Sequence, residues 1–291
     1  MDAEKTLDKF IKNLADKGRS SSTTVAYRKD ISQLNNFIKE RGIDHYKKVS
    51  LTDLQDWKDS FAKKGYAPKS VSRKINSLKT FFSFLLEEGL ISENVSGEVN
   101  HPIIEAKAPR VLKVTEYRAL RDACYSDKRL FAIVELLLQT GMRIGELARI
   151  RVKDLKFSED GVGEINIPAF EKEPQRTVPF NLRGQEAVKS YLKVRNDSGA
   201  KTEVVFITKT GRNFLIRNIR SSINQYFKKA GIKSVTVNDL RHTFAAVQIR
   251  AGVRIKDLYK LLGHKRASTT ERYLEYIKPE TEEECDTPVE L

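Results

Sequence analysis

The chain has 291 residues, of which 40% are hydrophobic and 32% are charged. This composition is typical of a soluble globular protein with a highly charged surface, and the length is sufficient for two domains. The 53 basic and 39 acidic residues leave a formal charge of +14. A polyanionic partner, above all nucleic acid, is favoured by this charge, although excess lysine can also serve solubility alone.

The cysteine content and the apolar segments exclude several other classes of protein. The two cysteines, Cys124 and Cys285, are far apart and have no metal-like partner pattern. This argues against a disulfide scaffold and a zinc site, and it fits a reducing compartment. The first residues lack the apolar core of a signal peptide, and no stretch approaches the roughly 18 apolar residues of a membrane span. We therefore expect a cytoplasmic protein with no membrane partner.

The first hundred residues are expected to form four helices. Each segment carries apolar residues at helical spacing and ends at a glycine, and no β-hairpin signal interrupts them. The segments are residues 6–18, 20–42, 50–65 and 67–89.

Two of these helices begin with hydroxyl and basic residues together, in "GRSSSTTVAYRK" and "YAPKSVSRK". Backbone N–H groups at a helix start, and the positive end of its dipole, favour phosphate. Ordinary N-capping next to a solvated basic face would produce the same pattern. The DNA contacts that the pattern predicts are Arg19, Arg28, Lys69, Arg73 and Lys74.

A change of pattern separates this helical domain, residues 1–97, from a second domain at residues 113–278. Residues 98–112 contain two prolines and no clear period, which indicates a linker. In the second domain, "RLFAIVELLLQTG" predicts a buried helix, and "GVGEINIPAF" and "QRTVPF" predict strands around a polar turn. The expected fold class is mainly α with a small β-sheet.

The last segment, residues 279–291, is an acidic tail. Residues 278–291 hold one basic and six acidic side chains, which gives a charge of −5. The tail is either a solvated terminus or a segment that docks on a basic surface of this chain or of a neighbour.

Four stretches of the second domain carry residues suited to phosphate chemistry. They are "TGMRIGEL" with Arg143, the turn "EKEPQR" with Lys172, "NDLRHTFA" with Arg241, and "LLGHKRASTTERYLEY" with His264 and, nine residues later, Tyr273. Guanidinium groups bind the non-bridging oxygens of a phosphodiester, and a lysine can protonate a leaving oxygen. A tyrosine becomes a competent nucleophile when cationic neighbours stabilise its phenolate.

In this order and spacing, "TGMRIGEL", "RHTFA" and "LLGH…STTERY" resemble the tyrosine recombinase (phage-type integrase) family, and the chain as a whole is similar to its Xer-like members. The resemblance implies a helical, SAM-like core-binding domain, a linker and a catalytic domain. It also implies a site-specific recombinase that acts through a 3′-phosphotyrosine intermediate without metal or cofactor, in integration and excision or in dimer and cointegrate resolution.

The resemblance also implies a role for each of the five residues. Arg143 and Arg241 would bind the scissile phosphate, and His264 would donate a hydrogen bond to it. Lys172 would protonate the leaving 5′ oxygen, and Tyr273 would attack the phosphorus. Tyr276 is expected to pack against or cap its helix.

The sequence departs from the family pattern at Asn238, where the family usually has histidine or lysine. An asparagine side chain does not exchange protons near neutral pH, so Asn238 is expected to orient Tyr273 or the phosphate. The neighbouring His242 is expected to be structural, as in the family motif. Glu146 and Asp154 are expected to hold the region of Arg143. The turn around Lys172 also looks one residue shorter than in many relatives, and Lys172 is its only lysine.

The implied partner is double-stranded DNA with inverted half-sites, bound by a homotetramer on two duplexes, with accessory proteins possible. Two alternatives remain open at this point. A type IB topoisomerase shares the chemistry, and a non-catalytic DNA-binding regulator could keep the fold.

Overall fold

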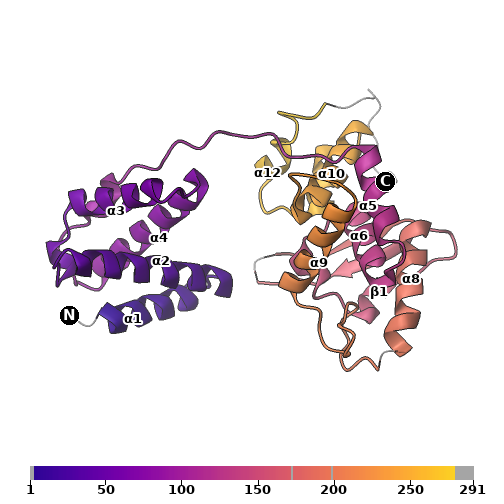
Figure 1. Ribbon diagram of the computed structural model, residues 1–291, viewed down its shortest axis with the longest axis horizontal. Helices are drawn as coiled ribbons and strands as arrows, with labels where there is room; N and C mark the ends of the chain where they lie inside the picture. Colours follow the sequence, from indigo (N-terminus) through magenta and orange to yellow (C-terminus); the bar gives the residue numbers. More distant parts are fainter. Residues whose placement is uncertain (1–2, 172, 198, 279–291) are drawn as a thin grey trace. The chain divides into compact units, whose positions relative to one another are not determined.

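The computed structural model describes residues 3–278 apart from residues 172 and 198, and it divides into two compact units, Met1–Ala106 and Lys107–Leu291 (Figure 1). The division lies within the predicted linker, residues 98–112. Among the described residues, no helix is long and apolar enough to cross a membrane. The acidic tail at residues 279–291 lies outside the described residues.

The first unit is helical throughout, and the four predicted helices are confirmed. Ser20 and Ser50 act as N-caps, and Ser50 forms a capping box with Asp53. Glycines with positive φ follow the helix ends, as the sequence predicts. The elements are α1 (Ala3–Asp16), α2 (Ser21–Glu40), η1 (Tyr46–Lys48), α3 (Leu51–Lys63), α4 (Pro68–Glu87) and η2 (Val95–Glu98).

A buried ion cluster joins α2 to α4 inside this unit. The carboxylate of Asp30, fully buried, accepts hydrogen bonds from Lys74 Nζ at 2.8 Å and Ser77 Oγ at 2.7 Å, and it also pairs with Arg73. The Lys74 ammonium lies 4.7 Å from the centre of the Phe61 ring. The structure thereby corrects the predicted DNA contact at Lys74, because this ammonium is buried and already bound.

The buried cluster predicts a large loss of stability when its carboxylate is removed. In Asp30→Asn, the cations of Arg73 and Lys74 lose their counter-charge, and we expect a loss of about 3–5 kcal/mol in unfolding free energy. Urea unfolding followed by tryptophan fluorescence measures this free energy, because the single tryptophan, Trp57, is buried in this unit.

The matched control is Asp8→Asn, which breaks the exposed Asp8–Arg28 ion pair of 2.7 Å in the same unit. Its expected effect is below about 1 kcal/mol. Equal, small losses in both variants would show that the cluster does not stabilise the unit.

The second unit is built around one buried helix. Every residue of α6 (Lys128–Thr140) from Ala132 onward is buried, as the apolar run predicts. Helices α5, α8 and α10 and strand β3 pack against α6, and Figure 1 shows α5 beside it. The other helices are α5 (Val114–Cys124), α7 (Ile144–Leu147), η3 (Val152–Asp154), α8 (Leu182–Asp197), α9 (Ile216–Lys229), α10 (Val237–Arg250), α11 (Ile255–Leu262) and α12 (Ser268–Glu271).

A three-stranded antiparallel sheet, ordered β1-β2-β3, completes this unit. The predicted hairpin is confirmed in β2 (Gly163–Ile167) and β3 (Arg176–Phe180), and the short β1 (Leu155–Lys156) adds an edge that the sequence pattern does not indicate. Ile165 pairs with Val178, and both are buried. The alternation along β3 places residues 176, 178 and 180 on the inward face.

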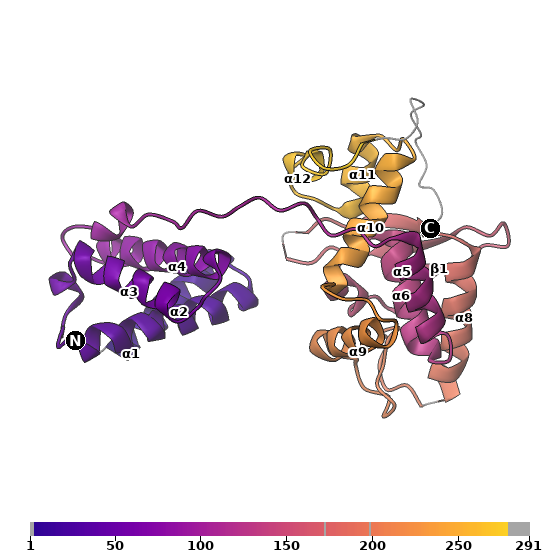
Figure 2. The same cartoon turned by 45° about the horizontal axis from the view of Figure 1, so that its top comes forward.

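The last three helices form a separate small core. Figure 2 shows α11 and α12 beside one end of α10. Phe244 of α10, Leu262 of α11 and Tyr273 after α12 are buried together. Burial of apolar surface in this core is therefore what brings Tyr273 to α10.

Candidate active site

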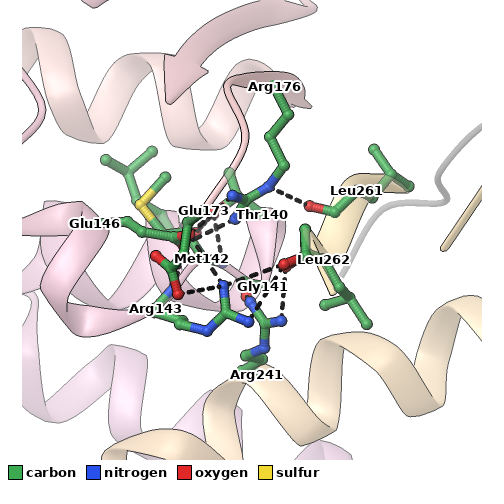
Figure 3. A network of polar contacts seen from close by, with 12 residues as sticks. Thr140, Gly141, Met142, Arg143, Glu146, Glu173, Arg176, Arg241, Leu261 and Leu262 are labelled. Carbon is green, nitrogen blue, oxygen red and sulfur yellow. Dashed lines mark hydrogen bonds and ion pairs between the residues drawn. The ribbon is translucent and has the colours of Figure 1, made fainter. Parts of the chain in front are cut away.

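Three consecutive backbone carbonyls at the end of α11, residues 261 to 263, each accept a hydrogen bond from a different arginine. Arg176 donates from Nε to the first at 2.8 Å, Arg241 from Nη2 to the second at 2.7 Å, and Arg143 from Nη2 to the third at 3.3 Å. The last carbonyls of a helix have no partner within it and carry partial negative charge. The helix end therefore gathers three cations (Figure 3).

Arg143 reaches this point because α6 ends in a tight turn. Gly141 has a φ of 59°, and a Cβ built there would lie 2.4 Å from the Phe244 ring, so only glycine fits. The chain reverses, and Arg143 becomes the N-cap residue of α7. Its side chain stays one-third exposed, at 33%.

The buried carboxylate of Glu146 holds two of the arginines. Arg176 donates to both of its oxygens at 2.8 Å, and Arg143 donates from its backbone nitrogen at 2.6 Å and from Nη1 at 3.2 Å. Burial raises the pKa of Glu146, but the hydrogen bonds and charges of the two arginines outweigh it and leave the pKa below its ordinary value. Asp154 instead accepts from Arg151 N at 2.8 Å and caps η3, which corrects its expected role.

Arg176 belongs to the same cluster, although the sequence pattern did not single it out. Its side chain is only 7% exposed. A signal was present, because residue 176 belongs to the inward-facing set of β3 with Val178 and Phe180. An arginine on the inward face of a strand requires a buried acceptor, which Glu146 and the carbonyl of residue 261 supply.

Arg241 is the most deeply held of the three cations. Its guanidinium is buried and donates to the carbonyls of Gly141 and Leu262, both at 2.7 Å. Burial and the nearby charge of Arg143 lower the pKa of Arg241 to about 9, so the group is still cationic at neutral pH. Five N–H groups belong to a guanidinium, so donors remain for a ligand.

His264 follows the left-handed turn at Gly263, where φ is 60°. Its Nδ1 lies 2.7 Å from Thr270 Oγ1. Burial, followed by the charges of Arg241 and Arg143, lowers the pKa of His264 to about 3. The imidazole is therefore neutral at physiological pH.

Tyr273 is 6% exposed, and its hydroxyl lies 2.6 Å from Nδ1 of His242. Burial raises the pKa of Tyr273, while the charges of Arg241 and Arg143 lower it less, so the net shift is upward. The two cations favour the phenolate, as expected, but burial has the larger effect on the pKa. The resting side chain is therefore a neutral phenol. Tyr276 is 40% exposed.

Asn238 and His242 lie four residues apart on α10 and contact each other. The Asn238 amide nitrogen is 2.8 Å from Nε2 of His242. Asn238 therefore contacts His242 directly, and the other ring nitrogen of His242 contacts Tyr273. The i, i+4 spacing of the two residues was the available signal.

Lys172 lies outside the described residues, but its flanking residues are placed. The backbones of Phe170 and Glu173 exchange two hydrogen bonds of 3.1 and 2.9 Å. Glu173 Oε1 lies 3.4 Å from Arg143 Nη1, and the Arg149 guanidinium lies 3.6 Å from the centre of the Phe170 ring. The hairpin end on either side of position 172 is therefore attached beside Arg143.

In residues 3–278, with the two gaps at 172 and 198, no group of three or more histidine, cysteine, aspartate or glutamate side chains is arranged to hold a metal ion.

Two family models match this chain. One, described as "Phage integrase family", matches residues 110–278, and the other, "Phage integrase, N-terminal SAM-like domain", matches residues 7–89. The chain belongs to the phage integrase family. It is a Xer-like, site-specific tyrosine recombinase, an enzyme that breaks and rejoins DNA strands.

Individual proteins agree with this assignment. The recombinase is 28% identical to "Tyrosine recombinase XerC" of Listeria welshimeri, over 91% of this chain and 90% of that one. It is 27% identical to the crystal structure of XerA recombinase, with a TM-score of 0.54 and coverage of 92% and 93%. A lambda integrase tetramer bound to a Holliday junction shares the fold at 19% identity, with a TM-score of 0.71 and coverage of 91% and 78%.

The Glu146 geometry predicts a pH-dependent loss of stability. Because the folded pKa of Glu146 is below its ordinary value of 4.5, its contribution is complete above that value and disappears as the pH falls through the folded pKa. Glu146→Gln should destabilise the recombinase by about 3–5 kcal/mol at pH 7, because two arginines lose their counter-charge.

The difference between wild type and Glu146→Gln should then narrow below about pH 4.5. Urea unfolding followed by far-ultraviolet circular dichroism at pH 7 and pH 4 measures both quantities. A difference of the same size at the two pH values contradicts the assignment of the charge to Glu146.

Proposed function

We propose that Tyr273 is the nucleophile of this recombinase and that it forms a 3′-phosphotyrosine bond with one DNA strand. The observation that supports this most is the burial of Tyr273 in one core with Leu262, whose carbonyl binds Arg241. The guanidiniums of Arg143 and Arg241 are bound to neighbouring carbonyls at the end of α11. A phosphodiester bound by both arginines would lie within reach of the phenol.

Arg143 and Arg241 would stabilise the charge that develops on the non-bridging oxygens. Both are held by backbone carbonyls before DNA arrives, so little reorganisation is needed in the transition state. His264 would add a hydrogen bond. If the Thr270 hydroxyl donates to Nδ1, Nε2 carries the proton and can donate to the phosphate.

Lys172 would protonate the 5′ oxygen as it leaves. It is the only lysine of its turn, and Glu173, which follows it, already contacts Arg143. A lysine ammonium can act as a general acid toward an alkoxide.

The first unit would bind DNA through the exposed starts of α2 and α4. Arg19, Arg28, Lys69 and Arg73 are exposed there, although Arg28 and Arg73 also pair with carboxylates of the unit. Phosphate contacts by such residues position a protein on a duplex without selecting its sequence. Lys74 is not included, because it is buried.

The substrate would be double-stranded DNA with inverted half-sites, bound by a homotetramer on two duplexes in the cytoplasm. The lambda integrase tetramer on a Holliday junction supports this assembly by its shared fold. The similarity to XerC supports a role in integration and excision or in dimer and cointegrate resolution, with accessory proteins as possible partners.

Covalent capture tests the assignment of the nucleophile. Wild type is incubated with a pool of nicked random-sequence duplexes, and DNA joined to protein is recovered after denaturation and sequenced to find the site. On that site, Tyr273→Phe should form no adduct while binding DNA nearly as well as wild type, because one oxygen is lost from a charge-dominated interface.

Tyr276→Phe is the matched control and should form the adduct at the wild-type rate. An adduct with Tyr273→Phe, or its loss only in Tyr276→Phe, would reassign the nucleophile.

For Lys172, the expected defect depends on the leaving group. Lys172→Ala should cut an ordinary duplex slowly, because the 5′ alkoxide needs a proton. A duplex with a 5′-bridging phosphorothiolate at the same site leaves as a thiolate and needs none, so the variant should cut it at nearly the wild-type rate. Normal binding without this rescue would place the general acid elsewhere.

A further inference from the structure

The attacking phenol has to lose its proton, and the fold raises the barrier to that loss. Burial leaves the pKa of Tyr273 above its ordinary value in spite of two neighbouring arginines. A buried phenol with a raised pKa is a weak nucleophile unless a base accepts its proton as the new bond forms.

His242 occupies the position that such a base requires. Its Nδ1 lies 2.6 Å from the Tyr273 hydroxyl, within the range of a strong hydrogen bond. The two rings approach at 5.6 Å between their centres, and His242 is anchored in the middle of α10. The hydroxyl is thereby held against a group that exchanges protons near neutral pH.

The other groups near Tyr273 are less suited to accept the proton. Arg143 and Arg241 are cations. His264 has its Nδ1 engaged with Thr270. In the part of the chain that the structure describes, His242 is the titratable side chain with a hydrogen bond to the phenol.

We propose that His242 is a catalytic residue that accepts the phenolic proton of Tyr273 during strand cleavage and returns it during rejoining, with Asn238 as its positioning residue. This inference rests on the proposed role of Tyr273 as nucleophile.

The proton and the bonds balance in both directions. In cleavage, the O–H proton of Tyr273 moves to Nδ1 of His242, the phenolic oxygen bonds to phosphorus, and the bond from phosphorus to the 5′ oxygen breaks. The leaving oxygen takes its proton from a separate donor, Lys172 in the proposed assignment. In rejoining, the 5′ hydroxyl gives its proton back to the same donor, now neutral, as its oxygen bonds to phosphorus. The bond from phosphorus to the phenolic oxygen breaks, and His242 returns its proton to the departing phenolate.

Asn238 contacts the second ring nitrogen of His242, with its amide nitrogen 2.8 Å from Nε2. His242 accepts a proton at Nδ1 only when Nε2 carries the hydrogen, so the amide acts after a half-turn, with its oxygen accepting from Nε2–H. The same orientation suits the imidazolium, because Nε2 keeps its hydrogen after Nδ1 has accepted the proton. An amide at position 238 thus acts through His242 and needs no proton of its own.

The charged groups around His242 keep its ring neutral. Burial lowers the pKa of His242, Asp239 on the same helix raises it, and Arg241 lowers it, with a net shift downward. Among the other groups near it, Tyr273 is neutral at rest and His264 is neutral at physiological pH. The imidazole is therefore unprotonated at neutral pH, which is the form that accepts a proton.

The first experiment measures single-turnover cleavage of the captured nicked duplex from about pH 5 to 9, around the ordinary histidine pKa. In wild type, the rate should fall at acidic pH, as His242 becomes protonated, and this fall should lie below the ordinary histidine pKa of about 6.5 because burial lowers the pKa of His242. His242→Gln should bind the duplex normally, cut it about 10²- to 10⁴-fold more slowly, and lose this acid limb. His45→Gln, an exposed histidine of the first unit, is the control and should match wild type.

The positioning role of Asn238 is tested in the same assay. Asn238→Asp should move the acid limb to higher pH, because a carboxylate beside Nε2 stabilises the imidazolium. Asn238→Leu should slow cleavage, because leucine has no polar atom to hold Nε2 of His242. An unchanged profile in Asn238→Asp contradicts its action through His242.

A second experiment uses the DNA-free enzyme, so that it does not depend on cleavage. The chain has four histidines, which makes their ring nitrogens assignable by NMR. The pKa of His242 should rise in Asn238→Asp, and its tautomer balance should change in Tyr273→Phe. If neither substitution alters the His242 signal, the contacts of His242 with Asn238 and Tyr273 are overturned.

The outcomes separate the two proposals. If wild type forms the adduct and Tyr273→Phe does not, the assignment of Tyr273 as the nucleophile is supported. A His242→Gln variant that then cuts at the wild-type rate, or more slowly with the same acid limb, overturns the role of His242 alone. If wild type forms no adduct with any duplex of the pool, both proposals fall.

Discussion

The catalytic unit depends on one interaction, the binding of three arginines to three successive carbonyls at the end of α11. Arg143 comes from the start of α7, Arg176 from the start of β3 and Arg241 from α10. A helix end left without partners would be costly in this buried setting, and three unpartnered guanidiniums would repel one another. The carbonyls supply hydrogen-bond acceptors for the guanidiniums, and the guanidiniums supply donors for the carbonyls. Segments far apart in the sequence therefore meet at one point (Figure 3).

Charge balance at this point explains the reactivity expected of the site. Glu146 is the buried carboxylate that binds both Arg143 and Arg176, while Arg241 is held by carbonyls alone. The cluster therefore keeps excess positive charge, which suits a phosphate and lowers the pKa of nearby groups. Burial acts in the opposite direction on Tyr273 and prevails. In the proposed mechanism, the site that would bind the phosphate thus holds Tyr273 as a neutral phenol, and a neutral base beside it would be needed to accept its proton.

Much of the fold could be predicted from the sequence, because local rules decided it. The helices of the first unit follow from apolar spacing and terminal glycines, and the β2–β3 hairpin follows from alternation around a polar turn. The family motifs singled out Arg143, Arg241, His264 and Tyr273, and the structure brings these four together. Lys74 was misplaced, because the pattern of charges at a helix start does not show that Asp30, on another helix, buries its ammonium.

By itself, the sequence determined the helices, the small sheet, the family and the chemical types at the site, since periodicity, capping and motif spacing are properties of neighbouring residues. Only the tertiary structure decided which of those side chains touch. It assigned Arg176 to Glu146, Asn238 to His242, and His242 to Tyr273. Two of these contacts form between residues 30 and 31 positions apart, and the contact of Asn238 with His242 depends on which face of α10 they share. Packing of the whole unit sets them, and no local pattern encodes that packing.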